Sequence, residues 1–227
     1  MYESLMCLPY FQGMSKDEIT SILDKVKLIF TRHNDGERIV AQGAPCNNLT
    51  LLMRGTLTSK CVAPDGRYTL IEEIRTPFAF EPYSLFGLSP TYRSSYYANG
   101  ECDILAIEKS YLFNEFSRYN IFMMNIMNIL CQRVQLKNSQ IWNTRRMPLT
   151  EKIIEFIAVR SEQQEGCKTL QIKMDDLADI LDETRINVSS ALNRLQKEGL
   201  IELRRKEIHI PSFKLLASYR QQTSSLE

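Results

Sequence analysis

The chain has 227 residues, of which 44% are hydrophobic and 24% are charged, and its net charge at pH 7 is +1. This is the composition of a globular protein, and the length suggests one large domain or two small ones. A charge near zero excludes a broadly cationic surface, so any nucleic-acid binding has to come from a local patch. No apolar run approaches the ~20 residues of a membrane span, and the first residues lack the pattern of a secretion signal. Six scattered cysteines without C-x-x-C spacing predict reduced thiols in a cytoplasm.

The first 110 residues change from a helical to a strand pattern near residue 27. Ser15 is placed to cap the segment KDEITSILDKV, whose apolar residues recur at helical spacing. After residue 27 the sequence breaks into short β-rich pieces separated by turn signals, among them KLIFTR, NLTLLMRG and RYTLIEEI. Many short strands at even spacing are typical of a barrel or jelly roll, so the chain is expected to be α+β with an N-terminal β module.

Residues 111–143 return to a helical period and are expected to end in one long helix. Its apolar side chains recur at alternating steps of four and three residues, with a break at Lys137. They are Met123, Met127, Leu130, Val134 and Ile141. A helix that packs on its own two-fold copy shows such a seam, and so does a helix that packs on its own β module. Pro148 follows this helix and marks a domain boundary.

The C-terminal third has the pattern of a helix-turn-helix followed by a hairpin. A short helix, MDDLADIL, precedes a turn and a second helix that Thr184 can cap and Gly199 can end. The residues expected to be buried on one face of this second helix are Val188, Ala191, Leu192 and Leu195. The segments LIELRR and KEIHI are expected to pair as a β-hairpin wing.

The outer face of the second helix carries side chains that suit base recognition. Arginine pairs with guanine, asparagine pairs with adenine, and an exposed isoleucine can contact a thymine methyl group. The predicted base contacts are Arg185, Ile186, Ser190 and Asn193. The predicted phosphate contacts are Thr184, Arg204, Arg205 and Lys206. The alternative is a solvated polar face, because the region from Pro148 onward holds 12 Lys and Arg but 13 Asp and Glu.

The stretch DDLADILDETRINVSSALNRLQKEGLI resembles the winged helix of the Crp/Fnr transcription regulators. The residues that carry the resemblance follow the spacing of that family. They are Leu177, Ala178, Thr184, Arg185, Val188, Ser189, Leu192, Leu195, Gly199, Leu200 and Ile201. A second stretch, GAPCNNLTLLMRGTL, is similar to the β-roll of the family. The resemblance therefore covers nearly the whole chain in the order β-roll, long helix, winged helix.

The resemblance implies three parts. A cyclic-nucleotide-binding-like jelly roll (a double-stranded β-helix) acts as sensor over residues 1–118, a dimerisation helix and hinge covers residues 119–147, and a winged helix-turn-helix that binds DNA covers residues 148–227. It favours a second copy as the partner of the long helix, and a palindromic duplex bound by a homodimer. Ile186 and Ser190 stand where the best-studied members carry Glu and Arg, so a sequence preference different from that of the cyclic AMP receptor is expected.

The resemblance also places an effector pocket in the β-roll and on the long helix. Its candidate residues are Phe80, Glu81, Tyr83, Arg93, Ser94, Ser95, Lys137 and Asn138. In members that bind cyclic AMP, the glutamate takes a ribose hydroxyl, and an arginine, a hydroxyl and backbone N–H groups hold the phosphate. Here Phe80 replaces a glycine and Pro82, which donates no N–H, follows the glutamate, so an effector other than cyclic AMP is expected. The alternative for Glu81 and Arg93 is an ordinary surface ion pair.

Other cofactors find less support in the sequence. Cys7 stands alone in the N-terminal region, which argues against the iron–sulfur cluster of the oxygen-sensing branch. Haem is an alternative, with His33 or a cysteine as ligand beside an aromatic run that is otherwise β-roll core. The run comprises Phe78, Phe80, Tyr83, Phe86, Tyr92, Tyr96 and Tyr97. The chain shows no catalytic motif and no His/Cys cluster, so neither an enzyme nor a metal site is expected.

The sequence thus predicts a cytoplasmic, homodimeric transcription regulator whose candidate partners are double-stranded DNA, a second copy of the chain and RNA polymerase, with no membrane. Three alternatives stay open. The regulator could respond to a cyclic nucleotide or haem, it could bind a small molecule and act through protein contacts, or it could bind DNA constitutively with the β-roll as a scaffold. Steep dependence of DNA binding on salt separates the DNA-binding readings from the protein-contact reading.

Overall fold

The computed structural model describes residues 5–143 and 147–223, and gives only the backbone for residues 136, 137, 139–143 and 220–223. The chain forms two compact units. Unit 1 contains the residues up to Thr58 together with Ile74–Gln135, and unit 2 contains Ser59–Glu73 together with the residues from Leu136 onward. The boundaries placed at residues 118 and 147 from the sequence do not anticipate that residues 59–73, from the middle of the β region, belong with the C-terminal unit.

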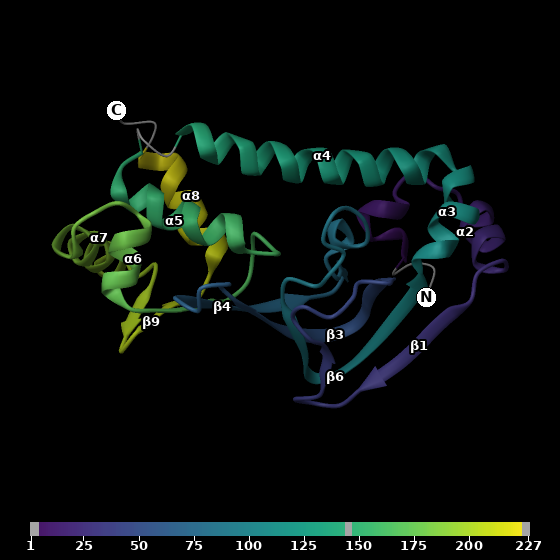
Figure 1. Ribbon diagram of the computed structural model, residues 1–227, viewed down its shortest axis with the longest axis horizontal. Helices are drawn as coiled ribbons and strands as arrows, with labels where there is room; N and C mark the ends of the chain where they lie inside the picture. The colour runs from purple at the N-terminus through teal and green to yellow at the C-terminus, as the bar shows by residue number, and fades with distance from the viewer. Residues whose placement is uncertain (1–4, 144–146, 224–227) are drawn as a thin grey trace. The chain divides into compact units, whose positions relative to one another are not determined.

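Unit 1 is a β-roll with short helices at one end (Figure 1). Its strands are β1 (Leu28–His33), β2 (Arg38–Val40), the first part of β3 (Asn48–Val62), β5 (Phe78–Ala79) and β6 (Ser95–Glu108). Its helices are η1 (Pro9–Phe11), α2 (Lys16–Leu23), η2 (Pro82–Ser84), α3 (Lys109–Asn114), η3 (Phe116–Arg118) and α4 (Asn120–Asn143) as far as residue 135. The strand β6 is central, because it pairs antiparallel with β1 and with β2 and neighbours β3.

Two local features of unit 1 follow directly from residue type. The Ser15 side chain accepts a hydrogen bond from the Glu18 N–H while the Glu18 carboxylate accepts one from the Ser15 N–H, so the predicted helix cap is confirmed as a capping box. Within β3, Gly55 has a φ of +98°, and a Cβ there would lie 2.6 Å from the carbonyl oxygen of Glu101. The close approach of β3 to β6 therefore requires glycine at this position.

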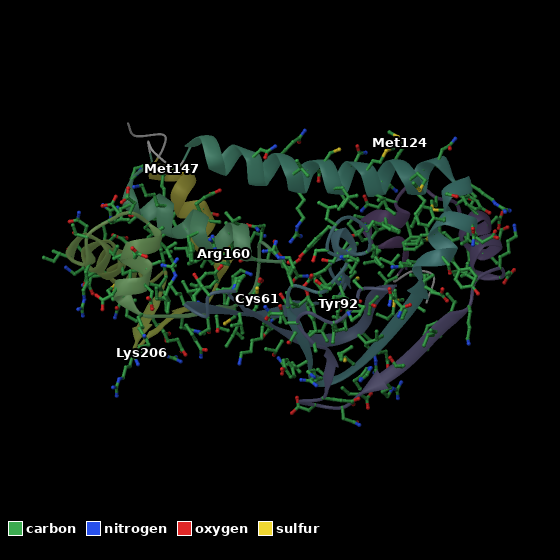
Figure 2. The ribbon with its side chains drawn as sticks, in the orientation of Figure 1. Cys61, Tyr92, Met124, Met147, Arg160 and Lys206 are labelled. Carbon is green, nitrogen blue, oxygen red and sulfur yellow. The ribbon has the colours of Figure 1, made fainter. Side chains whose placement is uncertain are left out.

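The long helix α4 has one face on the core of unit 1 and another face in solvent. Phe122 is fully buried, and Met123 packs against the same core. In contrast, the side chains of Met124, Met127 and Val134 are 52%, 47% and 56% exposed. Figure 2 shows Met124 on the side of α4 that faces away from the strands. Of the predicted seam, Met127 and Val134 are thus exposed, Leu130 is half-buried, Met123 faces its own core, and the side chain of Ile141 lies outside the described residues.

Unit 2 combines helices with an antiparallel sheet of the order β4-β7-β9-β8. Its strands are the end of β3, most of β4 (Tyr68–Arg75), β7 (Lys168–Ile172), β8 (Glu202–Arg204) and β9 (Glu207–Ile210). Its helices are α5 (Leu149–Arg160), α6 (Met174–Ile180), α7 (Arg185–Lys197) and α8 (Phe213–Thr223), besides the end of α4. The apolar faces of these elements meet in one core around Ile153, Leu170, Leu192 and Phe213. Among the helices described, none is both long and apolar enough to cross a membrane.

Candidate nucleic-acid interface and effector region

The helices α6 and α7 form a helix-turn-helix whose turn is set by local hydrogen bonds. After α6 the chain passes through Asp182, whose φ of +53° is left-handed, and the Glu183 N–H donates to the carbonyl of Ala178 over 3.0 Å. This is how a helix is commonly ended, with aspartate here in place of the more usual glycine. The turn is held from outside by Lys152 of α5, whose Nζ lies 2.8 Å from Oε1 of Glu183. The Lys152 ammonium lowers the pKa of Glu183, which keeps the pair charged at neutral pH.

The second helix of the motif begins and ends where the sequence predicts. The hydroxyl of Thr184 accepts a hydrogen bond of 3.2 Å from the Asn187 N–H, so the predicted cap is confirmed. The helix is followed by Gly199, which has a φ of +70°. The four residues predicted for the inner face, Val188, Ala191, Leu192 and Leu195, are all buried. The four predicted base-contact residues, Arg185, Ile186, Ser190 and Asn193, are all exposed.

The wing is a short hairpin of β8 and β9, in register from Glu202↔His209 to Arg204↔Glu207. Its two turn residues are Arg205 and Lys206, and Lys206 has a left-handed φ of +60°. Figure 2 shows Lys206 at the end of this hairpin. All three basic wing residues are exposed, although Arg204 is paired with Glu202 and Glu207 of its own hairpin. This leaves Arg205 and Lys206 as the wing cations better placed to meet an anionic partner.

A cleft of about 320 Å³ separates the start of α7 from the wing. We call it the wing cleft. Its charged lining residues are Lys173, Asp175, Arg185, Arg204, Lys206 and Glu207. Cations outnumber carboxylates there, so the region is locally basic although its overall charge is not. Lys173, which follows β7, was not among the residues selected from the sequence, because only the fold brings the end of that strand to the wing.

Arg185 at the start of α7 is held by a weak internal partner. Its guanidinium lies 3.4 Å from the Asp175 carboxylate, and both side chains are about 70% exposed, at 68% and 72%. An exposed pair of this kind contributes between zero and about 1 kcal/mol. A guanine edge or a phosphate can therefore replace Asp175 at little cost, and the pair aims the guanidinium before any ligand arrives.

The predicted effector region has a buried carboxylate at its centre. Glu81 is fully buried and has a left-handed φ of +37°. Its carboxylate accepts hydrogen bonds from the backbone N–H groups of Arg93 and Ser94 over 2.7 and 2.9 Å. It also accepts from the hydroxyls of Ser84 and Tyr96 over 3.1 and 3.2 Å. Four donors thus converge on one internal anion.

The remaining effector candidates are spread over core and surface. Phe80 and Tyr96 are buried with ring centroids 4.7 Å apart, and Phe78 packs on both rings. The guanidinium of Arg133 on α4 lies 3.8 Å above the Tyr83 ring, so the helix does reach this part of the β-roll. The Ser95 hydroxyl accepts from the Gln42 N–H, and the Arg93 side chain is exposed. Asn138 is exposed on α4, and the Lys137 side chain lies outside the described residues.

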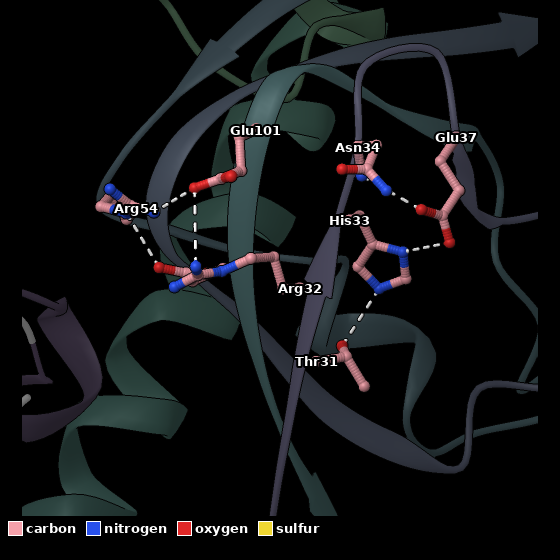
Figure 3. A network of polar contacts seen from close by, with 8 residues as sticks. Thr31, Arg32, His33, Asn34, Glu37, Arg54 and Glu101 are labelled. Atoms are coloured by element: carbon pink, nitrogen blue, oxygen red, sulfur yellow. Dashed lines mark hydrogen bonds and ion pairs between the residues drawn. The ribbon is translucent and has the colours of Figure 1, made fainter.

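The histidine considered as a haem ligand is engaged with its neighbours. Figure 3 shows the His33 ring between Glu37 and Thr31, with contacts of 2.8 Å from Nδ1 and 3.0 Å from Nε2. The same view shows Arg32 and Arg54 paired with Glu101 on the face of the strands. Both ring nitrogens therefore have protein partners. In the part of the chain that the structure describes, no group of three or more His, Cys, Asp or Glu side chains is arranged to hold a metal ion.

Comparisons with known proteins agree with this geometry. Residues 151–219 match the family described as the Crp-like helix-turn-helix domain. The fold is similar to that of the catabolite activator protein of Thermus thermophilus, with a TM-score of 0.52, 18% identity, and coverage of 95% of this chain and 99% of that one. It is also similar to the sensor domain of the transcriptional regulator DNR of Pseudomonas aeruginosa, with a TM-score of 0.52, 15% identity, and coverage of 61% and 91%. No curated protein matches the chain by sequence.

Proposed function

We propose that this chain is a transcription regulator of the Crp/Fnr type, which binds a palindromic DNA site as a homodimer; the match of residues 151–219 to the Crp-like helix-turn-helix domain supports this. The observation that carries the proposal is the position of Arg185, Ile186, Ser190 and Asn193. They are exposed on α7, whose start is fixed by the Thr184 cap and opens onto the basic wing cleft. In this arrangement α7 enters the major groove, and the wing contacts the backbone.

The β-roll is then a sensor whose effector is not a cyclic nucleotide. The resemblance implies that Glu81 holds a ribose hydroxyl, and that an arginine, a hydroxyl and backbone N–H groups hold the nucleotide phosphate. In this chain the backbone N–H groups of Arg93 and Ser94 donate to the Glu81 carboxylate itself. A nucleotide phosphate would have to displace a buried carboxylate and leave it without its donors, which is strongly unfavourable. The same internal bonds also favour the second candidate, a regulator that binds DNA without an effector.

The test is selection of DNA followed by binding at several salt concentrations. Purified protein is mixed with a pool of random duplexes, and a selected duplex is then titrated by fluorescence anisotropy. We expect two inverted half-sites and an affinity that falls steeply with salt. Arg185→Ala should cost roughly 1–3 kcal/mol and relax the preference at one base pair per half-site. The matched control is Arg38→Ala, which removes an exposed arginine from unit 1.

A second variant tests the wing. Lys206 is replaced by asparagine, because Asn tolerates a left-handed φ better than alanine does. Lys206→Asn should weaken binding to all duplexes alike and should leave the selected sequence unchanged. Indifference of the wild-type protein to DNA at every salt concentration would reject the proposal in favour of a winged helix that contacts proteins.

A further inference from the structure

The β3–β4 hairpin lies in the middle of the β region of the sequence but belongs to unit 2, and its tip lies beside the wing. The strand β4 pairs antiparallel with β7, and Tyr68 lies opposite Ile172. Arg67 immediately precedes Tyr68, and Lys173 immediately follows Ile172, so the register sets these two cations at the same end of the sheet. On the other side of β7, the Ile172 N–H donates to the carbonyl of Lys206 over 2.9 Å. The sheet therefore brings three separate segments, and a cation from each, to one edge.

These cations surround a second hollow of about 310 Å³, which we call the hairpin hollow. Its charged lining residues are Arg67, Lys173, Arg205, Lys206 and Glu207. Four cations face one carboxylate, and that carboxylate already lies 3.5 Å from Arg204. The hairpin hollow shares Lys173 and Lys206 with the wing cleft, which extends to Arg185. A continuous basic strip thus runs from the first residue of α7 to the tip of the β3–β4 hairpin.

We propose that the hairpin hollow binds backbone phosphates of the DNA duplex whose bases α7 reads, and that Arg67 is a phosphate-contact residue supplied by the β3–β4 hairpin. This inference rests on the proposed function. The occupant follows from charge, because four cations gather at one edge while Asp65 and Asp179 pair with Arg67, so a polyanion can pair with the remaining cations and compete for Arg67. The strip extends the contact surface beyond α7 and the wing, at positions that fix orientation and carry no sequence preference.

The internal partners of these cations are compatible with phosphate binding. The Arg67 guanidinium is 2.6 Å from Asp65 and 2.5 Å from Asp179, and its side chain is 39% exposed. These exposed pairs orient the guanidinium but stabilise it little, so a phosphate can compete with either carboxylate. Within the described residues, Lys173 and Arg205 have no ion-pair partner at all. Asp179 is the residue that opposes the proposal, since it would have to separate from Arg67 on binding.

The test measures binding of the full chain to a random-sequence duplex of about 30 base pairs by fluorescence anisotropy at several salt concentrations. Arg67→Ala should weaken binding about three- to tenfold near 0.1 M salt and should lower the slope of log affinity against log salt by about one per subunit. Arg67→Lys should recover most of the slope. The matched control is Lys60→Ala, which removes an exposed cation from β3 of the same hairpin but lines neither hollow.

Each outcome separates the inference from the function on which it rests. Lys173→Ala breaks no internal ion pair, so it should reproduce the lower slope even if Arg67→Ala impairs folding of the hairpin. The inference would be overturned if the wild-type protein binds DNA and neither Arg67→Ala nor Lys173→Ala binds more weakly than the control Lys60→Ala. The proposed function would then still stand. Failure of the wild-type protein to bind any duplex would reject both.

Discussion

Glu81 is a buried carboxylate in unit 1, and its oxygens accept hydrogen bonds from four donors. Its backbone conformation is left-handed, which costs a residue with a side chain on the order of 1 kcal/mol. A buried carboxylate without partners would be far more costly, so the hydrogen bonds are what make the conformation tolerable. Two of the donors are the backbone N–H groups of Arg93 and Ser94, which lie 12 and 13 residues after Glu81 in the sequence. The carboxylate therefore links the segment after β5 to the segment before β6.

We expect Glu81→Gln to destabilise unit 1 by about 2–4 kcal/mol, even though the side chain keeps its size. The amide NH₂ group donates and does not accept, so at least one buried N–H loses its partner and faces another donor. Urea denaturation followed by circular dichroism measures the loss. Glu101→Gln, which changes an exposed carboxylate paired with Arg54, serves as the control and should cost less than about 1 kcal/mol. Equal stability of the two variants would contradict the role assigned to Glu81.

At the residue level, the sequence could predict identities but not partners. The helix caps at Ser15 and Thr184 were predictable because their partners lie three residues away. Glu81 was selected as an effector ligand, yet its partners are supplied by a turn that only the folded β-roll brings near. Arg67 was read only as the first residue of the strand piece RYTLIEEI, since nothing in APDGRYTL indicates that a strand 100 residues later lies beside it. Long-range pairing leaves no local pattern, so such residues were missed.

Within unit 2, the strand β4 is joined to the C-terminal segment by a buried ion pair as well as by its ladder with β7. Glu72 is 2% exposed and Lys168 is fully buried, and Nζ of Lys168 lies 3.3 Å from Oε2 of Glu72. Nζ also donates to the Gln163 carbonyl over 2.7 Å, while the Glu72 carboxylate accepts from the Glu162 N–H. Burial raises the pKa of Glu72 to about 7, and burial also lowers the pKa of Lys168.

The raised pKa of Glu72 predicts a pH-dependent stability with a definite sign. The unfolded chain loses this proton near pH 4.5, and the folded protein retains it up to about pH 7. The folded state therefore binds more protons in this window, so the contribution of Glu72 to the free energy of unfolding falls as pH rises from 4.5 to 7, by at most about 3 kcal/mol. Thermal unfolding of the full chain between pH 4.5 and 8 should show this fall in the wild type and not in Glu72→Gln.

Two further variants check that the effect belongs to the buried pair. Glu165→Gln changes an exposed carboxylate paired with Lys214 and should keep the wild-type pH profile. The double variant Glu72→Gln with Lys168→Met should be more stable than Lys168→Met alone, since the single change leaves a buried carboxylate without its cation. Parallel profiles for the wild type and Glu72→Gln would refute the assignment.

At the level of elements, the sequence predicted the helices and the hairpin that have a strong apolar period. It did not predict which strands pair with each other in the sheet. The helix-turn-helix, the wing and the long helix were expected near their observed bounds, because each has its own apolar period and end signals. The strand piece RYTLIEEI was also expected, but the pairing of β4 with the piece TLQIKM, which contains most of β7, was not. Either piece alone fits any sheet edge, so the assignment of residues 59–73 to unit 2 required the structure.

On the scale of the whole molecule, the exposed face of α4 is the feature that a single chain leaves unexplained. Met124, Met127 and Val134 fall on one face at coiled-coil spacing, and Cys131 between them is also exposed. These three large apolar side chains are each about half exposed to water. Burying them against a second α4 would remove apolar surface from water and would stabilise a dimer. The proposed homodimer places two copies of this face together around a two-fold axis. The face differs from the predicted seam at Met123, which the core of unit 1 already covers.

Dimerisation should therefore be abolished by Met127→Glu combined with Val134→Glu. At a two-fold seam each new carboxylate meets its own copy, so desolvation and like-charge repulsion act together. We expect sedimentation equilibrium to give a dimer for the wild type and a monomer for the variant at micromolar concentration. Affinity for the selected palindrome should then fall by about 10²–10⁴, because the two half-sites no longer bind one molecule. Gln132→Glu adds a carboxylate on another exposed face of α4 and should remain dimeric. A dimeric double variant would show that α4 is not the interface.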